Sequence, residues 1–286
     1  MSDHIVVNVT RHPPVGRCIY CGSDGGARGL RDEHIVALSL GGNVVLPKSS
    51  CKDCEGITSY IEGVVSRSIF GAMRSYFKVQ KRKRPIEQTV TMEFETAVGK
   101  EIRQVKISDA LPLYSIEYFD PPGLLVDELP APIVAKYIHV WYSHECAEYI
   151  KRLTKPGDKK WSLTTGGNYV ALARTIAKIA HASAVATFGI DSFKPLLTGV
   201  IRGTEPNIGY YIGTAEPPTK PLQLPAGTHN MPHRIQGGLM QHRETKRFYL
   251  TVNVCLFPFT GAPTYIAMVG EPTPALVERV SPAFVS

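Results

Sequence analysis

Three short stretches near the start of the chain decide how it is interpreted: CIYC at residues 18–21, DEHIV at residues 32–36 and CKDCE at residues 51–55. The first and third stretches each hold two cysteines separated by two residues, and 29 residues lie between the two pairs. In a protein that is not secreted, such pairs indicate zinc or redox chemistry rather than disulfides. Two pairs fit a closed tetrahedral zinc site better than a redox site. We therefore predict a structural Zn²⁺ ion with four thiolate ligands: Cys18, Cys21, Cys51 and Cys54.

The residues between the two cysteine pairs predict a β-hairpin. A glycine-rich loop leads into a short strand over residues 33–38, and the glycine pair at residues 41–42 ends it. The second cysteine pair opens a helix, for which Ser49 or Ser50 is the expected N-cap. Apolar residues at helical spacing extend this helix past Arg67 and Arg74 towards Phe77. The predicted unit is therefore a cysteine pair, a hairpin, and a helix that carries the second pair.

The order and spacing of these stretches resemble the HNH nuclease family in its zinc-bound ββα-metal, or treble-clef, form. The resemblance covers about residues 15–65. It implies that Glu33 binds a catalytic Mg²⁺ or Mn²⁺ ion and that His34 takes a proton from the attacking water. It also implies that Glu55, directly after the last cysteine, is the second ligand of this ion; the family usually has Asn or His at that position. The function implied is a metal-dependent endonuclease that acts on DNA.

The chemistry of phosphodiester hydrolysis requires the same residue types. An imidazole titrates near neutral pH and can serve as the general base. Mg²⁺ takes oxygen ligands and uses one or two carboxylates, which leaves positions for phosphate and water. Thiolates are soft ligands and hold zinc instead. The sequence thus offers one soft, closed site beside one hard, open site.

Two other functions stay open. In the first, the four-cysteine unit is a zinc ribbon that stabilises the fold or binds nucleic acid, and His34 and the glutamates do no chemistry. In the second, the C-terminal region senses a ligand or partner and controls a nuclease that is silent until triggered.

The net charge of +7 is concentrated at the start of the chain. Residues 1–85 carry 13 Lys and Arg against 7 Asp and Glu, whereas the remaining residues carry 19 against 18. A basic field attracts polyanions such as DNA or RNA, although a solvated basic linker would explain the same residues. The residues predicted to contact phosphates are Arg67, Arg74, Lys78, Lys81, Arg82, Lys83 and Arg84.

The rest of the chain predicts a larger mixed domain, so the expected fold class is α+β with domains at residues 1–85 and 86–286. The second domain would serve targeting, dimerisation or sensing, and a homodimer is possible. We expect a hairpin over residues 86–107, strands over 114–119, 248–256 and 264–269, helices over 133–153 and 168–188, and a loop over 214–233.

The remaining histidines and cysteines are expected to be structural. We predict solvated or hydrogen-bonded side chains, rather than metal ligands, for five histidines: His139, His144, His229, His233 and His242. Cys146 and Cys255 are predicted to be core thiols. No apolar run is long enough to span a membrane and no secretory signal is seen, so we expect a cytoplasmic protein without a membrane partner.

Overall fold

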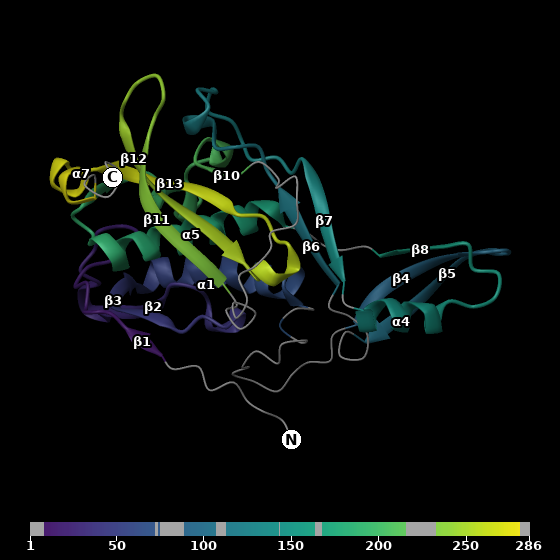
Figure 1. Cartoon of the computed structure of the whole chain (residues 1–286). Helices are drawn as coiled ribbons and strands as arrows, with labels where there is room; N and C mark the ends of the chain where they lie inside the picture. Colours follow the sequence, from purple (N-terminus) through teal and green to yellow (C-terminus); the bar gives the residue numbers. More distant parts are fainter. Residues whose placement is uncertain are drawn as a thin grey trace.

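The computed structural model describes residues 9–71, 74, 89–106, 113–142, 144–163, 168–215 and 233–280. These residues form a mixed α+β structure, which confirms the predicted class (Figure 1). None of the described helices is long and apolar enough to cross a membrane.

The N-terminal unit, residues 9–71, is called the head. Its three-stranded sheet has the order β1-β3-β2, with β2 (Leu30–His34) antiparallel to β3 (Val44–Cys51) and β1 (Thr10–Arg11) parallel to β3. A short 3-10 turn, η2 (Leu38–Leu40), lies between β2 and β3. The helix α1 (Lys52–Ser68) follows β3 directly. The predicted hairpin and helix are thus both present.

Three details of the head differ from the predictions. The strand predicted over residues 33–38 begins three residues earlier, at Leu30, and already ends at His34. Ser49 and Ser50 are buried in β3, and the helix N-cap is Cys51 instead. The chain stays extended up to the second cysteine pair because β3 continues to pair with β2 there. In addition, α1 ends at Ser68 and does not continue unbroken to Arg74.

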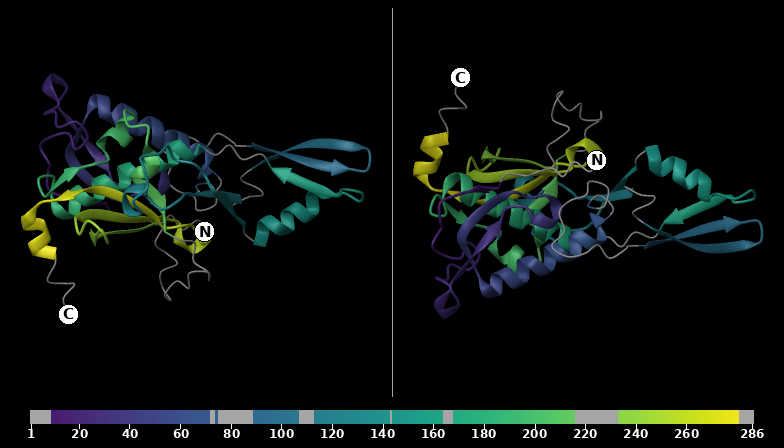
Figure 2. Two further views of the ribbon diagram at one scale, coloured as in Figure 1. Left: turned by 90° about the horizontal axis from the view of Figure 1, so that it is seen from above. Right: turned by 90° about the horizontal axis from the view of Figure 1, so that it is seen from below.

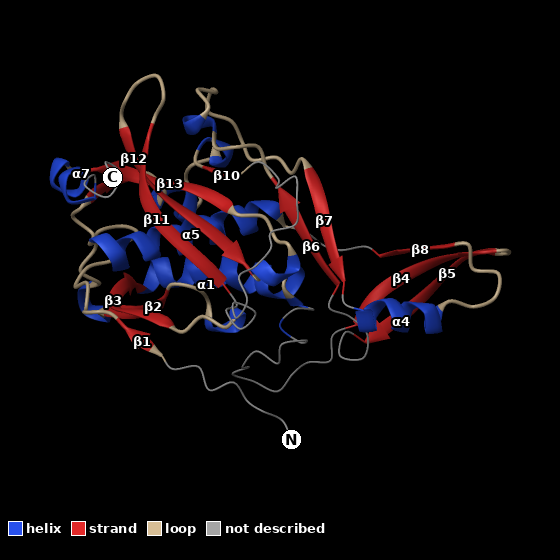
Figure 3. Ribbon diagram, viewed as in Figure 1, coloured by secondary structure: helices blue, strands red, loops and turns tan. Residues whose placement is uncertain are grey.

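A second unit, called the body, is built around α5 (Tyr169–Phe188). Asn168 caps this helix by accepting a hydrogen bond from the Ala171 amide at 2.9 Å, and Gly189 at φ 92° ends it, so the helix predicted over 168–188 is confirmed. One face of α5 packs on α1, and another packs on a five-stranded sheet (Figures 1 and 3). The order of this sheet is β10 (Ile212–Thr214), β13 (Tyr265–Pro272), β12 (Phe248–Leu256) and β11 (His233–Gln241), with β9 (Phe193–Pro195) also on β13.

The head and the body share one hydrophobic core. A single cluster of buried side chains extends from Cys18 in the head to Leu276 in α7 (Pro274–Val280) and includes most of α5. The short helix α6 (Thr198–Arg202) contacts both α5 and α1. The predicted domain boundary at residue 85 lies outside the described residues, so the division into 1–85 and 86–286 stays a prediction.

A smaller lobe projects away from the head and the body (Figures 1 and 2). It consists of the hairpin β4 (Thr89–Thr96) and β5 (Gly99–Lys106), the strand β8 (Lys160–Leu163) on β4, and α4 (His144–Leu153). Its buried side chains are not part of the main core: Met92, Phe94, Val105 and Ile150. A separate two-stranded sheet is formed by β6 (Leu113–Tyr118) and β7 (Tyr137–Tyr142).

Most predictions for the C-terminal region are confirmed, but the helix predicted over residues 133–153 is wrong in its first half. Residues 137–142 form β7, which is rich in β-branched and aromatic residues that favour strands. Only residues 144–153 are helical. The predicted loop over residues 214–233 ends where β11 begins, and its residues 216–232 lie outside the described part of the chain. The sequence did not predict β11, because it contains the glycine pair at residues 237–238 and glycine weakens a strand.

Candidate functional site

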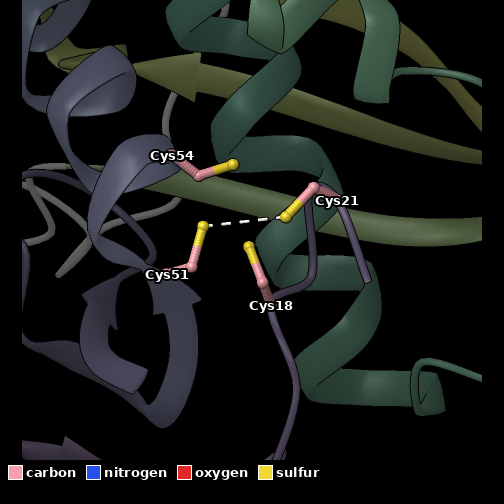
Figure 4. A group of neighbouring side chains, drawn as sticks. All are labelled: Cys18, Cys21, Cys51 and Cys54. Carbon is pink, nitrogen blue, oxygen red and sulfur yellow. Dashed lines mark hydrogen bonds between the residues drawn. The ribbon is translucent and has the colours of Figure 1, made fainter. Parts of the chain in front are cut away.

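The four predicted cysteine ligands gather at one end of the hairpin and helix (Figure 4). Cys18 and Cys21 lie in the loop before β2, Cys51 ends β3, and Cys54 lies in the first turn of α1. Their sulfur atoms all lie within 4.8 Å of one another, and those of Cys21 and Cys51 are 3.6 Å apart. A tetrahedral zinc ion with Zn–S bonds of ~2.3 Å would place its sulfurs about 3.8 Å apart. The cluster therefore fits a single ion of this kind.

Local backbone contacts hold the first cysteine pair in place. The Gly22 amide donates to the Cys18 carbonyl at 2.8 Å, and Gly22 has a φ of 78° that favours glycine. The Ile19 amide donates to the Ser49 carbonyl at 2.8 Å, which ties this turn to β3. Burial tends to raise the pKa of Cys51, but hydrogen bonds from the Cys54 amide and the neighbouring thiols bring it to about 7. Metal binding would deprotonate the remaining thiols.

Glu33 is the first residue of the predicted catalytic site, and it is engaged inside the protein. Its side chain is only 7% exposed, and its carboxylate lies 2.7 Å from the ammonium of Lys178 on α5. The Lys178 ammonium, which is completely buried, also lies 2.7 Å from the carboxylate of Glu62 on α1. We call these three residues the lysine–carboxylate cluster. It joins a strand and a helix of the head to the central helix of the body.

The electrostatics of this cluster favour a charged lysine. Burial alone would lower the pKa of Lys178, but the charges of Glu33 and Glu62 raise it above its ordinary value. Burial raises the pKa of Glu62; the charge of Glu33 adds to this, and Lys178 opposes it. Burial, with the same two carboxylates, also raises the pKa of the Tyr20 hydroxyl, which has no hydrogen-bond partner among the described residues. Lys178 is thus the cation that stabilises this buried acidic site.

His34, Glu33 and Glu55 together form no metal-binding group among the described residues. His34 is half-buried at the end of β2, opposite Val45 of β3. Glu55 lies at the surface in the first turn of α1, where its carboxylate is 2.9 Å from the Lys52 ammonium. Within the described residues, the four cysteines are the only group of three or more side chains placed to hold a metal ion. Glu33 and Glu55 are thus each paired with a lysine, and their binding of Mg²⁺ or Mn²⁺ stays a prediction.

Only two of the seven predicted phosphate contacts lie in the described part of the chain. Arg67 is exposed in the last turn of α1. Arg74 is half-buried and donates to the Ser66 carbonyl at 3.2 Å, and burial together with the charge of Arg67 lowers its pKa. The other five predicted residues lie outside the described part: Lys78, Lys81, Arg82, Lys83 and Arg84.

Two histidines of the body donate hydrogen bonds to backbone carbonyls of the head. His181 on α5 lies 2.7 Å from the Ile19 carbonyl, and His233 on β11 lies 2.7 Å from the Leu40 carbonyl. Burial lowers the pKa of each imidazole to about 4, so both are neutral at pH 7. These contacts connect the body to the head directly beside the cysteine cluster and beside η2.

Three of the predictions for histidines and cysteines outside the motif are confirmed. His233 is hydrogen-bonded, and His242 lies 3.0 Å from the Asp127 carboxylate. Cys255 is a buried thiol. The side chains of the other four residues lie outside the described part of the chain: His139, His144, His229 and Cys146.

Lys178 and His181 make contacts with the head that the sequence did not reveal. Both lie in an alanine-rich, largely apolar helix, and with Thr175 they form a polar stripe at a spacing of three residues. All three side chains are buried, at 0–1% exposure. Charged residues are almost never buried without a partner. A lysine in a largely apolar helix was therefore the signal in the sequence that a carboxylate from another element would be buried beside it.

The chain was compared with models of protein families, with curated proteins and with solved structures, and it matches none of them. Its function is therefore inferred from its own residues and contacts.

Proposed function

We propose that this chain is a zinc-stabilised HNH-type endonuclease that acts on DNA, with its chemistry in the head. One observation carries the proposal: the four cysteines gather at one end of a hairpin and helix, and His34 lies at the end of the hairpin's first strand. This arrangement matches the order of cysteine pair, acid–histidine pair, cysteine pair and helix that led to the resemblance. The cysteines hold zinc and do no chemistry.

His34 is the general base in this proposal. A half-buried imidazole can accept a proton from an attacking water at neutral pH, and positioned groups of this kind contribute about 10²- to 10⁴-fold to a rate. Excess positive charge in the first third of the chain supports a nucleic-acid substrate.

The test is cleavage of supercoiled plasmid DNA by the zinc-loaded full chain, with Mg²⁺ or Mn²⁺ added. We expect nicked or linear product, and a rate at least about 100-fold lower for His34→Ala. The matched control is His12→Ala, which removes another half-buried histidine of the head outside the motif. A folded, zinc-loaded His34→Ala variant that cuts as fast as the wild type would contradict the proposed mechanism.

A second candidate function is zinc-dependent binding of nucleic acid without cleavage. The observation that favours it is the buried ion pair between Glu33 and Lys178, because a carboxylate held in this way is not presented to a phosphate. Fluorescence anisotropy with labelled duplex DNA and RNA at several salt concentrations tests this candidate. It predicts salt-dependent binding, equal binding by His34→Ala, and intact nucleic acid after incubation.

A further inference from the structure

The ammonium of Lys178 is surrounded by four oxygen atoms of the head. Two are carboxylate oxygens, from Glu33 and Glu62, each at 2.7 Å. The other two are the backbone carbonyls of His34 and Ile35, and the second lies at 3.2 Å. The oxygens come from β2, from the residue that follows it, and from α1, whereas the cation comes from α5 of the body. We call this arrangement the oxygen cage.

The ligand chemistry of the oxygen cage is that of a hard metal ion. Carboxylate and carbonyl oxygens are the donors that Mg²⁺, Mn²⁺ and Ca²⁺ take in proteins. With both carboxylates ionised, the cage carries a charge of −2, which Lys178 balances only in part and a divalent ion would balance completely. One ammonium already occupies the centre, so a metal ion cannot enter without displacing it.

Lys178 is well placed to keep this position. It belongs to the same chain, so its ammonium does not have to be recruited from solution. Its side chain is fully buried, and α5 packs against both α1 and the five-stranded sheet. If the ammonium left, two buried carboxylates would remain without a cation, which is strongly unfavourable.

We propose that Lys178 is an internal cation that competes with a divalent metal ion for Glu33 and so weakens the binding of a catalytic metal by the head. This inference rests on the proposed function in one respect, namely that Glu33 is the carboxylate to which an HNH-type nuclease would bind its ion. It assigns to the body an inhibitory contact on the head.

The test measures binding of Mn²⁺ to the zinc-loaded full chain by electron paramagnetic resonance and titration calorimetry. The variant Lys178→Met keeps most of the aliphatic side chain but leaves the position of the ammonium empty. We expect it to bind one Mn²⁺ ion at least tenfold more tightly than the wild type. Its melting temperature should rise on addition of Mn²⁺, while that of the wild type should stay unchanged.

Two further variants show which residues hold the ion. Glu33→Gln combined with Lys178→Met should lose the Mn²⁺ site again. Lys52→Met is the matched control, because it also removes an ammonium from a head glutamate, Glu55, but at the surface. It should bind no additional Mn²⁺. A folded, zinc-loaded Lys178→Met protein without the Mn²⁺ site would overturn the proposal.

A second Mn²⁺-binding experiment, with Lys178 kept in place, does not depend on the folding of Lys178→Met. Glu33→Gln alone should leave the weak Mn²⁺ affinity of the full chain unchanged; a clear loss of affinity would show that Glu33 already binds metal and would overturn the proposal. Plasmid cleavage is scored separately. If Lys178→Met binds Mn²⁺ but neither it nor the wild type cuts DNA, the proposed function fails while the competition of Lys178 with the metal stands.

Discussion

Two polar clusters of opposite kind involve the head: the four cysteines within it, and the lysine–carboxylate cluster that it shares with the body. The cysteines come from the head alone, in two pairs that the sequence displays openly. The lysine–carboxylate cluster needs Glu33, Glu62 and Lys178, and the last of these lies more than a hundred residues further along the chain. The thiols of the first cluster would become thiolates on binding an external cation, whereas the second cluster already contains its own cation. Under the proposal made above, the head would take one metal ion at the cysteines and disfavour another at Glu33.

Breaking the cysteine cluster should have the largest effect. Cys54→Ser removes one of the four ligands, and structural zinc contributes on the order of 10 kcal/mol to folding in small zinc domains. We expect loss of stoichiometric zinc by elemental analysis and loss of the cooperative unfolding transition in circular dichroism. The control is Cys255→Ser, a buried thiol outside the cluster, which should retain its zinc. Full zinc content in Cys54→Ser would contradict the assignment of that ligand.

Breaking the lysine–carboxylate cluster should have the next largest effect. Lys178→Met leaves Glu33 and Glu62 buried without their cation, and removal of one partner from a buried pair costs about 3–5 kcal/mol. Urea unfolding in the absence of divalent ions measures this loss. Adding Glu33→Gln should restore part of it, because one of the two uncompensated charges is then removed. Equal stability of the single and double variants would argue against direct coupling.

Lowering the pH should weaken the contacts between head and body. His181 and His233 have a pKa of about 4 in the folded protein, against 6.5 for an ordinary histidine. The unfolded chain therefore takes up protons first, so stability is full above pH 6.5 and falls as the pH drops towards 4. We expect a loss of about 2 kcal/mol per histidine between pH 7 and pH 5. Urea unfolding across this range measures it.

A variant with a side chain that does not titrate sharpens the pH prediction. The glutamine of His233→Gln can still donate a hydrogen bond to the Leu40 carbonyl. The loss of stability between pH 7 and pH 5 should therefore be smaller than in the wild type by about the contribution of one histidine. His12→Gln is the comparison variant, because His12 is only half-buried. An unchanged pH dependence in His233→Gln would show that this imidazole does not resist protonation.

The smallest effect is expected at the surface of the head. Lys52→Met removes the ion pair with Glu55, whose two side chains are 51% and 35% exposed. Exposed pairs of this kind contribute less than about 1 kcal/mol. Urea unfolding should give a stability close to that of the wild type, in clear contrast to Lys178→Met. A loss similar to that of Lys178→Met would remove the distinction between a surface ammonium and a caged one.

The amino-acid sequence by itself determined the parts of this protein that depend on local spacing. Two cysteine pairs define a soft-metal site because four thiolates in this pattern fit few other arrangements. Alternating residues predicted the hairpin over 86–107 and the strand over 248–256, and the helix predicted over 168–188 coincides with α5. Each of these signals lies within a single element or between neighbouring ones.

Only the tertiary structure decided what Glu33 does. In the sequence it is an acid beside a histidine, which suits a catalytic metal ligand. In the fold, α5 brings Lys178 to 2.7 Å from it and buries both. The electrostatic environment of a charged side chain depends on its burial and on the charges around it. Residues distant in the sequence supply both for Glu33. The sequence could therefore predict the four-cysteine site from its own ligands, but not the ammonium that pairs with Glu33.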